Sequence, residues 1–478
     1  MKRGEGVDYT QLNNSELIMF IKAQINNFLP TKEKMQESMN YYNYKHDILK
    51  KQRLVIDKDG RLRPINNLPN NKIIDNQFGK VVDQKVNYLF SLPPLVKSED
   101  ENYQNEIQSL YDKKFMRTLN KTAYKAVIYG IAWWQIYIKD NGDFGYKLID
   151  NSTEVIPIWK DNNHESLDAL IRKYVVKVIE DGKIKDKIKV DFFTDDLVYH
   201  YNIENGDNYV LNGTNSYIQD EDGKQYSFDK IPFIYFKTNA EVPLLNKCKS
   251  LQDGINTILS NYQDNMLEDK RNTIMVLKNY DGENLGEFRR NLAQYGAVKV
   301  RTADGSQGGV DTLEVNVNSQ NYSFILQLLK EKLIENTRGI DFKNDRTSQA
   351  PNELNIKSMY TDIELDANAM ELEFTASLEH LEEFYKQIKN IKTDEVTKIE
   401  FKRNIMVNDE SLIGMIRNSI GLVSNETLLG QHPLVDNVQE EQEKLKKEQE
   451  EQLKDYVMNS LGGVNNELLG KESITDRG

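Results

Sequence analysis

The chain has 478 residues, and 62 Lys and Arg residues against 75 Asp and Glu residues give it a formal net charge of −13. Cys248 is the only cysteine, which excludes a disulfide framework and any multi-cysteine metal or iron–sulfur site and indicates a reducing compartment. Aromatic residues make up 9% of the chain, which is too large a share for an unfolded chain, so we expect ordered domains.

No targeting or membrane segment is expected. The first residues, MKRGEGVDYTQLNN, contain no apolar core after the basic ones, as a secretory signal would require. The densest apolar stretch, residues 126–138, is shorter than the roughly 20 residues that a bilayer span needs. We therefore expect a protein that is made and kept in the cytoplasm and has no membrane partner.

Three helices are predicted near the N-terminus. Apolar residues at helical spacing predict one helix over 15–29, which ends at Pro30, and a second over 31–52. A third is expected from about Asn71 to Leu89, because two prolines follow it and forbid its continuation.

A change in the spacing of apolar residues then indicates a sheet region. Residues 102–129 predict one or two further helices, and residues 131–138 predict a buried strand that places Trp133 and Trp134 in the core. From there to about residue 237, segments in which apolar residues recur at every second position lie between Asp-Gly and Asn-Gly turns. This pattern indicates a mostly antiparallel sheet. The fold class of the first half is therefore expected to be α+β.

Two helices bracket a small insert after Pro243. Apolar residues from Leu244 to Met266 recur at steps of three and four and predict one continuous helical seam. The insert, 271–317, is predicted to contain a strand, a short helix and a hairpin, and the second helix ends at Gly339 as a natural C-cap. We expect the two helices to be neighbours with the insert at their shared tip.

A polar loop and a very long helix follow. Residues 341–355 are polar, and apolar residues at helical spacing over 356–391 predict a helix of 36 residues, or about 54 Å. One domain of ordinary size cannot bury such a rod along its whole length, which favours packing against neighbouring copies. A small helical bundle and a charged helix over 438–456 are expected near the end of the chain.

Motifs that carry chemistry are absent from the sequence. None of the four Gly-Lys dipeptides belongs to a Walker A loop, and the five histidines show neither HExxH nor a paired spacing for a metal. We therefore expect no catalytic residue, no cofactor, no metal site and no enzyme. His46 and His380 are predicted to be structural, and the lysine-rich run over 172–189 is predicted to be a solvated strand face.

Seven segments spread along the chain carry a resemblance to a known family. They are YYNYKHDIL (41–49), NNKIIDNQFGKVVDQKVNYLFSLPP (70–94), YGIAWWQIYI (129–138), GENLGEFRR (282–290), RGIDF (338–342), KSMYTDIELDANAMELEF (357–374) and SNETLLGQHPLVDNVQEEQEK (424–444). Their colinear succession resembles the portal proteins of tailed bacteriophages, specifically the SPP1-type portal family.

The resemblance implies a portal fold with an α+β wing, two stem helices around a small αβ clip, a very long helix and a helical C-terminal crown. The implied parts are the wing (1–240), a stem helix (244–270), the clip (271–317), a second stem helix (318–339), the tunnel loop (341–355), the long helix with a return to the wing (356–399) and the crown with its charged helical tail (400–478).

The resemblance also implies a function. Portal proteins of this family form a dodecameric ring at one capsid vertex, through which double-stranded DNA is packaged and later ejected. The implied partners are further copies of the chain, the terminase large subunit, the major capsid and scaffolding proteins, the head-completion adaptor protein and the DNA. The implied location is the virion, at the portal vertex, with the host cytoplasm during assembly. The alternative is an intracellular coiled-coil scaffold without a DNA channel, although its heptads should continue where the insert and the polar loop interrupt them.

Three sets of residues are assigned to these roles. The tunnel-loop residues expected to lie closest to DNA are Lys343, Asn344, Asp345 and Arg346. The residues expected to dock partners at the clip are Glu287, Arg289, Arg290 and Asp304. The residues expected to pack subunits together are Leu251, Ile255, Ile258, Tyr262, Ile363, Met370 and Phe374.

Overall fold

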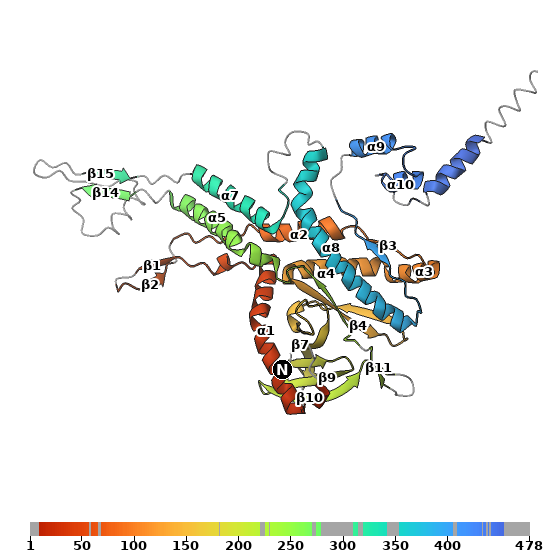
Figure 1. The fold of residues 1–478 in the computed structure, drawn as a ribbon. Coiled ribbons are helices and arrows are strands. Elements are labelled where there is room, and N and C mark those ends of the chain that lie inside the picture. The colour runs from red at the N-terminus through yellow and green to blue at the C-terminus, as the bar shows by residue number, and fades with distance from the viewer. Residues whose placement is uncertain are drawn as a thin grey trace, which may run out of the picture. The chain divides into compact units, whose positions relative to one another are not determined.

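The chain divides into two compact units. The structure is a computed structural model, and it describes residues 9–453 apart from 57–58, 66–67, 181, 220–224, 229, 270–273, 279–308, 314–318, 342–352, 405–408, 433, 436–437 and 439–440. The larger unit comprises Met1–Asn344 and Met359–Asn404, and the smaller unit comprises Asp345–Ser358 and Ile405–Gly478. Their helices and strands confirm the predicted α+β class (Figure 1).

Short helices dominate the described part of the smaller unit. The predicted bundle helices are present as α9 (Asp409–Asn418) and α10 (Asn425–Gly430), and residues 441–453 form the predicted charged helix. Ser424 caps α10, because its hydroxyl accepts the backbone N–H of Thr427.

The N-terminal helix differs from the prediction. α1 (Asn14–Tyr42) is one helix, and Pro30 lies inside it instead of ending it. Asn13 begins the helix with a capping box. Pro30 is exposed, so water can bind the carbonyl group that loses its helical partner there. The predicted second helix is therefore the C-terminal half of α1, followed by a 3₁₀ turn at Asp47–Lys50.

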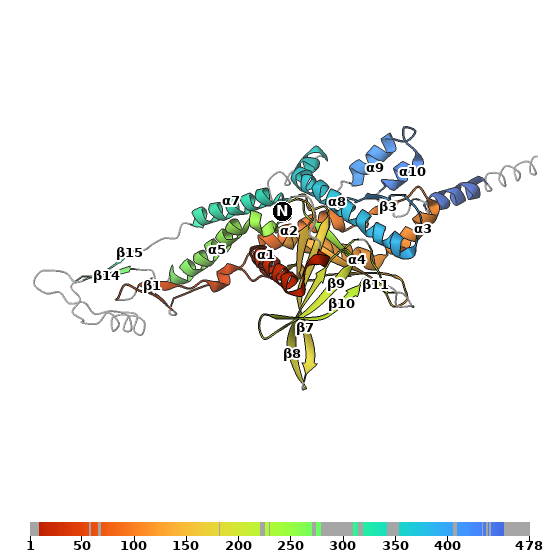
Figure 2. The ribbon, with the colours of Figure 1, turned by 60° about the horizontal axis from the view of Figure 1, so that its bottom comes forward.

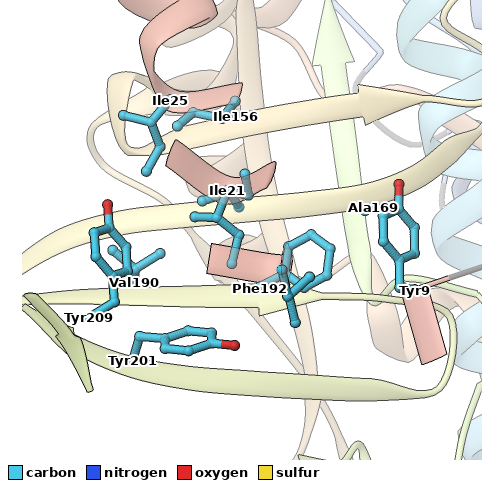
Figure 3. Close-up of a cluster of buried hydrophobic side chains, with 11 residues drawn as sticks. Tyr9, Ile21, Ile25, Ile156, Ala169, Val190, Phe192, Tyr201 and Tyr209 are labelled. Atoms are coloured by element: carbon cyan, nitrogen blue, oxygen red, sulfur yellow. The ribbon is translucent and has the colours of Figure 1, made fainter. Parts of the chain in front are cut away.

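α1 covers a five-stranded antiparallel sheet with the strand order β10-β9-β8-β7-β6. Its strands are β6 (Val155–Trp159), β7 (Leu167–Glu180), β8 (Lys183–Phe193), β9 (Leu197–Glu204) and β10 (Asn208–Ser216). Ile21 and Ile25 on α1 share one buried cluster with sheet residues such as Val190 and Phe192 (Figure 3). The lysine-rich run lies on β7 and β8, where its lysines are exposed or half-buried as predicted.

A second, three-stranded antiparallel sheet holds the two tryptophans. It contains β13 (Phe233–Lys237), β4 (Ile131–Ile138) and β5 (Phe144–Leu148), and α4 (Lys113–Tyr129) leads directly into β4. Gly130 joins α4 to β4 with φ = +89°, and a Cβ atom there would lie 2.7 Å from the backbone of Glu241. Only glycine fits this turn. Trp133 and Trp134 are fully buried, as predicted.

The remaining elements of the larger unit complete its architecture (Figures 1 and 2). They are β1 (Leu54–Ile56), β2 (Leu62–Pro64), α2 (Gln77–Phe90), β3 (Leu95–Lys97), α3 (Glu101–Leu110), β11 (Ile218–Gln219), β12 (Gln225–Tyr226), α5 (Lys249–Asp269), β14 (Ile274–Lys278), β15 (Gly309–Leu313), α7 (Ser319–Thr337) and β16 (Lys398–Glu400).

The predicted very long helix is present as α8 (Glu353–Lys389), and its apolar stripe is buried within the larger unit. The ring of Phe374 lies 4.6 Å from that of Phe90 and 5.2 Å from that of Phe236, measured between centroids. The stripe consists of Tyr360, Ile363, Ala367, Met370, Phe374, Leu378, Leu381 and Phe384.

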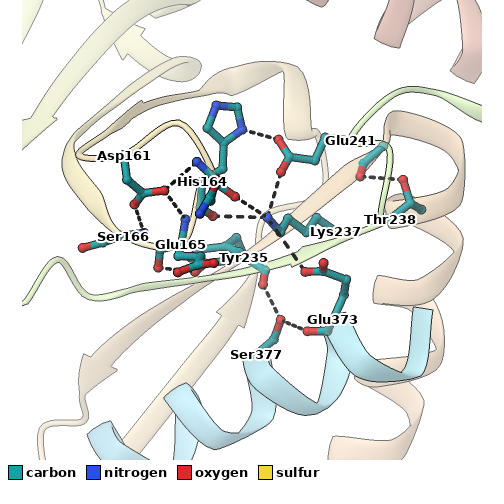
Figure 4. Close-up of polar contacts among 12 residues, drawn as sticks. Asp161, His164, Glu165, Ser166, Tyr235, Lys237, Thr238, Glu241, Glu373 and Ser377 are labelled. Carbon is teal, nitrogen blue, oxygen red and sulfur yellow. Dashed lines mark hydrogen bonds and ion pairs between the residues drawn. The ribbon is translucent and has the colours of Figure 1, made fainter. Parts of the chain in front are cut away.

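Polar contacts also tie α8 to the end of β13 (Figure 4). The buried Lys237 ammonium lies 2.8 Å from the Glu241 carboxylate and 3.8 Å from the Glu373 carboxylate of α8. The Ser377 hydroxyl donates to the carbonyl oxygen of Tyr235 at 2.6 Å. These contacts fix where α8 crosses the sheet.

The segment before α2 also differs from the prediction, because residues 71–76 are not helical and α2 begins only at Gln77. Backbone N–H groups of this segment, and that of Phe78 in the first turn of α2, donate to buried side chains of α5 that are spaced four residues apart. The bonds run from Asn71 to Asp264 (2.7 Å), from Ile73 to Ser260 (2.9 Å), from Asp75 to Asn256 (3.0 Å) and from Phe78 to Gln252 (2.9 Å).

Matched spacing explains this polar ladder. Two residues of extended chain and four residues of helix both advance by roughly 6 to 7 Å, so the N–H groups of Asn71, Ile73 and Asp75 meet successive polar side chains of α5. Further bonds complete the ladder: the amide of Asn256 contacts His46 Nδ1 at 2.8 Å, and Lys51 lies 2.8 Å from Asp264. Although burial acts in the opposite direction, hydrogen bonds from Asn71 and Lys51 hold the pKa of Asp264 below its usual value.

We predict that Asn256→Ala destabilises the protein strongly. The change leaves the Asp75 N–H group and the ring nitrogen of His46 buried without their partners, which costs about 2 to 4 kcal/mol of unfolding free energy. Thr257→Ala, at an exposed position on the same helix, is the matched control and should change that free energy by less than about 0.5 kcal/mol. Equal urea midpoints for the two variants would contradict a stabilising role for the ladder.

His380 on α8 makes stability depend on pH. Its ring lies against Phe384, with centroids 5.3 Å apart, and burial lowers the pKa of His380 to about 4, while the nearby Glu383 carboxylate acts in the opposite direction. The folded state therefore binds this proton more weakly than the unfolded chain, whose histidine pKa is about 6.5. Stability is lost as the pH falls below about 6.5, and the loss is complete near pH 4.

We predict that His380→Gln flattens this pH profile. Between about pH 7.5 and pH 5, the native histidine should cost about 2 kcal/mol that the neutral glutamine does not. Urea unfolding of both proteins at several pH values measures this difference. Parallel profiles would show that His380 is not the group that titrates.

Candidate functional site

α5 and α7 lie side by side, as predicted, and the insert joins them in the sequence (Figure 1). The rings of Tyr262 on α5 and Tyr322 on α7 are 5.0 Å apart between centroids. Of the insert, the structure describes β14 and β15, which pair in antiparallel fashion. The helical seam is shorter than predicted, because residues 244–247 form a 3₁₀ turn and α5 begins at Lys249.

A cluster of charged side chains anchors the start of α5 near the end of α1. The Lys249 ammonium lies 2.8 Å from Asp47 and 2.9 Å from Asp253. The Tyr41 hydroxyl donates to Asp253 at 2.6 Å. Hydrogen bonds from Lys249 and Lys50 hold the pKa of Asp47 well below its usual value, so this carboxylate is charged at neutral pH.

Each lysine of the two helices is paired with a carboxylate. α5 contains Lys249, and α7 contains Lys330 and Lys332, with no arginine in either helix. Lys330 lies 2.7 Å from Asp75, and Lys332 lies 2.7 Å from Glu335. The pair therefore presents no lysine or arginine without a counter-charge to an anionic ligand.

The end of α7 meets α2 and α8 at a buried ion pair. Lys85 of α2 lies 2.6 Å from Asp366 of α8, and its ammonium also reaches the carbonyl oxygen of Arg338. Burial lowers the pKa of Lys85, and Asp366 acts in the opposite direction. These three residues line a cavity of about 350 Å³. The left-handed residue after α7 is Arg338, with φ = +53°, and not the predicted Gly339.

The predicted tunnel-loop and docking residues lie outside the described residues, so their roles stay predictions. They are Lys343, Asn344, Asp345 and Arg346 in the loop, and Glu287, Arg289, Arg290 and Asp304 in the insert.

The predicted subunit-packing residues are partly or wholly covered by their own chain. Those that are buried are Ile255, Ile363, Met370 and Phe374, and those that are half-buried are Leu251, Ile258 and Tyr262. The argument that α8 is too long for one core is wrong for its described side chains, because α2 and the sheet residues of the same chain cover the stripe. A contact of α8 with a neighbouring copy stays a prediction, and it would have to use other faces, where Leu365 and Leu372 are exposed.

Sequence reasoning missed two features of this region. The first is the polar ladder, whose signal was a row of polar residues four apart beside the apolar seam of α5. The second is an exposed apolar patch on α7, formed by Phe324, Ile325 and Leu328. The apolar spacing of Ile325 and Leu328 predicts a helix face without identifying what covers it, so the sequence carried no signal for their exposure.

Two kinds of site are absent from the described ranges. Among these residues, no group of three or more His, Cys, Asp or Glu side chains is placed to hold a metal ion. No helix in the same part of the chain is long and apolar enough to cross a membrane.

Residues 21–455 match the family model described as "Phage portal protein, SPP1 Gp6-like". The portal protein of Clostridium phage phiCD119 is 28% identical over 438 residues, which cover 89% of this chain and 94% of that protein. The portal protein of Bacillus phage SPP1 is 26% identical over 458 residues, which cover 93% and 87%.

A chain in the neck of a native GTA particle, computed with C12 symmetry, aligns with 74% of this chain and 87% of its own length, at 9% identity. Its TM-score of 0.35 is too low to bear on the assembly of this chain. The family model covers most of the sequence, and two portal proteins align with nearly all of it, so the chain belongs to the SPP1 Gp6-like family of phage portal proteins.

Proposed function

We propose that this phage portal protein forms a dodecameric ring at one capsid vertex and that double-stranded DNA is packaged and later ejected through the central channel. The family match over residues 21–455 carries the proposal. Under it, α5 and α7 are the stem helices, the insert 271–317 is the clip, and residues 341–355 are the tunnel loop. Residues 1–240 are the wing, with the long helix and wing return at 356–399, and residues 400–478 are the crown.

The electrostatics of α5 and α7 support a conduit through which DNA moves. Each phosphate that a lysine or arginine neutralises adds affinity, and this affinity would slow translocation. The three lysines of these helices are already paired with carboxylates, and the whole chain carries a net charge of −13. These two helices therefore offer DNA few positive sites that could hold it.

The proposed partners follow from the same assignment. The clip would dock the terminase large subunit during packaging and the head-completion adaptor afterwards, because the insert separates two neighbouring helices. The major capsid and scaffolding proteins would contact the ring at the vertex, after assembly in the host cytoplasm. A coiled-coil scaffold is less consistent with the structure, because the stripe of α8 is buried in its own unit and not presented to another helix.

We predict that reversing the charges of Lys343 and Arg346 together lowers the amount of DNA packaged or retained, while ring assembly is unchanged. Carboxylates at these positions would repel the phosphates of passing DNA. Negative-stain imaging should show rings with a central hole for the wild type and the variant, and nuclease-protected DNA reports packaging. The matched control reverses Lys113 and Lys114, two exposed lysines of the proposed wing.

The outcomes separate the two claims. A wild-type protein that forms no ring would contradict the proposed function itself. Normal rings with wild-type packaging and retention in the Lys343 and Arg346 variant would instead identify residues 341–355 as an ordinary solvated loop.

We predict that shortening the clip abolishes packaging while the wing stays folded. Lys278 and Gly309 are cross-strand partners, so a two-residue Asn-Gly turn can replace 279–308 and keep β14 paired with β15. Circular dichroism and thermal unfolding check the fold, and protected DNA in assembled heads measures packaging. A full-length variant with Arg289→Glu and Arg290→Glu tests docking without shortening the chain. Undiminished packaging in both variants would refute the docking role.

A further inference from the structure

The ribbon formed by β1 and β2 has one apolar face, and that face is uncovered. Ile56 lies opposite Leu62, and Leu54 lies opposite Pro64. Cross-strand partners and residues two apart point to the same side of a ribbon, so these four side chains share one face. All four are exposed, and Ile56 is 72% exposed.

Such a ribbon needs a surface to pack against. A two-stranded ribbon alone is marginally stable in water, and a contiguous exposed apolar face marks an interaction site. Lys51, three residues before the ribbon, is bound to Asp264 of α5, so the start of the ribbon is held at a defined place beside that helix. The apolar face is thus presented in a defined position.

The second apolar surface in this region is the α7 patch, which consists of the exposed side chains of Phe324, Ile325 and Leu328. Residues four apart lie on one side of a helix, so Phe324 and Leu328 are neighbours and Ile325 flanks them. Phe324 is 68% exposed. Three large apolar side chains gathered on one helix cost free energy in water unless another surface covers them.

The ribbon and the α7 patch are held on opposite sides of α5. Asp264 binds Lys51, which precedes the ribbon, whereas Tyr262 contacts Tyr322 of α7. Two residues along a helix point about 200° apart, so α5 separates the two surfaces. Figures 1 and 2 both show α7 on one side of α5 and the ribbon on the other. Within one chain they cannot cover each other.

We propose that the apolar face of the ribbon of one copy packs on the α7 patch of the next copy around the ring. The inference rests on the ring of the proposed function. A cyclic ring closes through two different surfaces of each subunit, and this chain carries two uncovered apolar surfaces on opposite sides of one helix. The contact removes both from water at every subunit boundary and stabilises the ribbon.

Cysteine cross-linking tests this pairing with little background. Cys248, the only native cysteine, is 1% exposed, and burial raises the pKa of its thiol to about 12, so it reacts poorly. Double variants carry Ile56→Cys with either Phe324→Cys or Leu328→Cys, and purified full-length rings are treated with a short bis-maleimide. A denaturing gel should then show a ladder of covalent oligomers that extends beyond the dimer.

Control variants test whether the ladder of bands on the gel comes from the proposed contact. Each single cysteine variant should remain monomeric on the gel, and a mixture of Ile56→Cys with Phe324→Cys subunits should give dimers without a ladder. Ile179→Cys with Phe324→Cys is the matched control, because Ile179 is 78% exposed on β7 but is not part of either surface. This pair should give no ladder.

Separate readouts distinguish the failure of this pairing from the failure of the proposed function. Rings that form normally in negative stain but give no ladder with either double variant would overturn the pairing and leave the portal function standing. Cross-linked dimers from Ile56→Cys alone would also overturn it, because they require a symmetric contact between two ribbons. A protein that forms no ring would contradict the proposed function and this inference together.

Discussion

The backbone N–H groups of residues 71–78 impose the constraint on which much of the larger unit depends. Residues 71–76 belong to no helix or strand, and Phe78 lies in the first turn of α2, so these N–H groups have no partner within an element of their own and need acceptors elsewhere. α5 supplies them with Gln252, Asn256, Ser260 and Asp264. Hydrogen bonds are directional, so this ladder fixes the rotation and the register of α5, which apolar contacts alone would leave free to slip.

The position of α7 follows from that of α5. With the polar row of α5 turned toward the extended segment, Tyr262 faces the other way and contacts α7. Asp75 joins both helices, because its backbone is bonded to Asn256 and its carboxylate to Lys330. The pair is thus held to the body of the larger unit at several points, and the bonds of Lys249 to Asp47 and of Lys330 to Asp75 also neutralise these two lysines. A pair of helices that is anchored at several points and whose lysines are paired with carboxylates suits the proposed conduit for DNA.

The incorrect predictions share a physical cause. Pro30 was taken as a helix end because its ring removes a hydrogen bond, but Pro30 is exposed, and at an exposed position water can bind the carbonyl group that loses its helical partner. Residues 71–76 have a helical pattern, yet the side chains of α5, about 180 residues away, satisfy the same N–H groups in an extended form. The length argument for α8 left out partners within the same chain, such as Phe90 and Phe236, although a contact of α8 with a neighbouring copy stays a prediction. In each case the surroundings of the segment, either solvent or distant residues, decided between alternatives that the local pattern left open.

The sequence by itself determined the α+β class, the strand β4 with its two buried tryptophans, the length of α8 and the family, because periodicity and colinear motifs are local properties of the chain. It also placed two neighbouring helices around an insert. Only the tertiary structure decided which faces are covered: Ile363 and Phe374 lie inside the larger unit, whereas Leu328 and Ile56 are exposed. Burial depends on what the rest of the chain brings to each face, and apolar spacing identifies a face without identifying its partner.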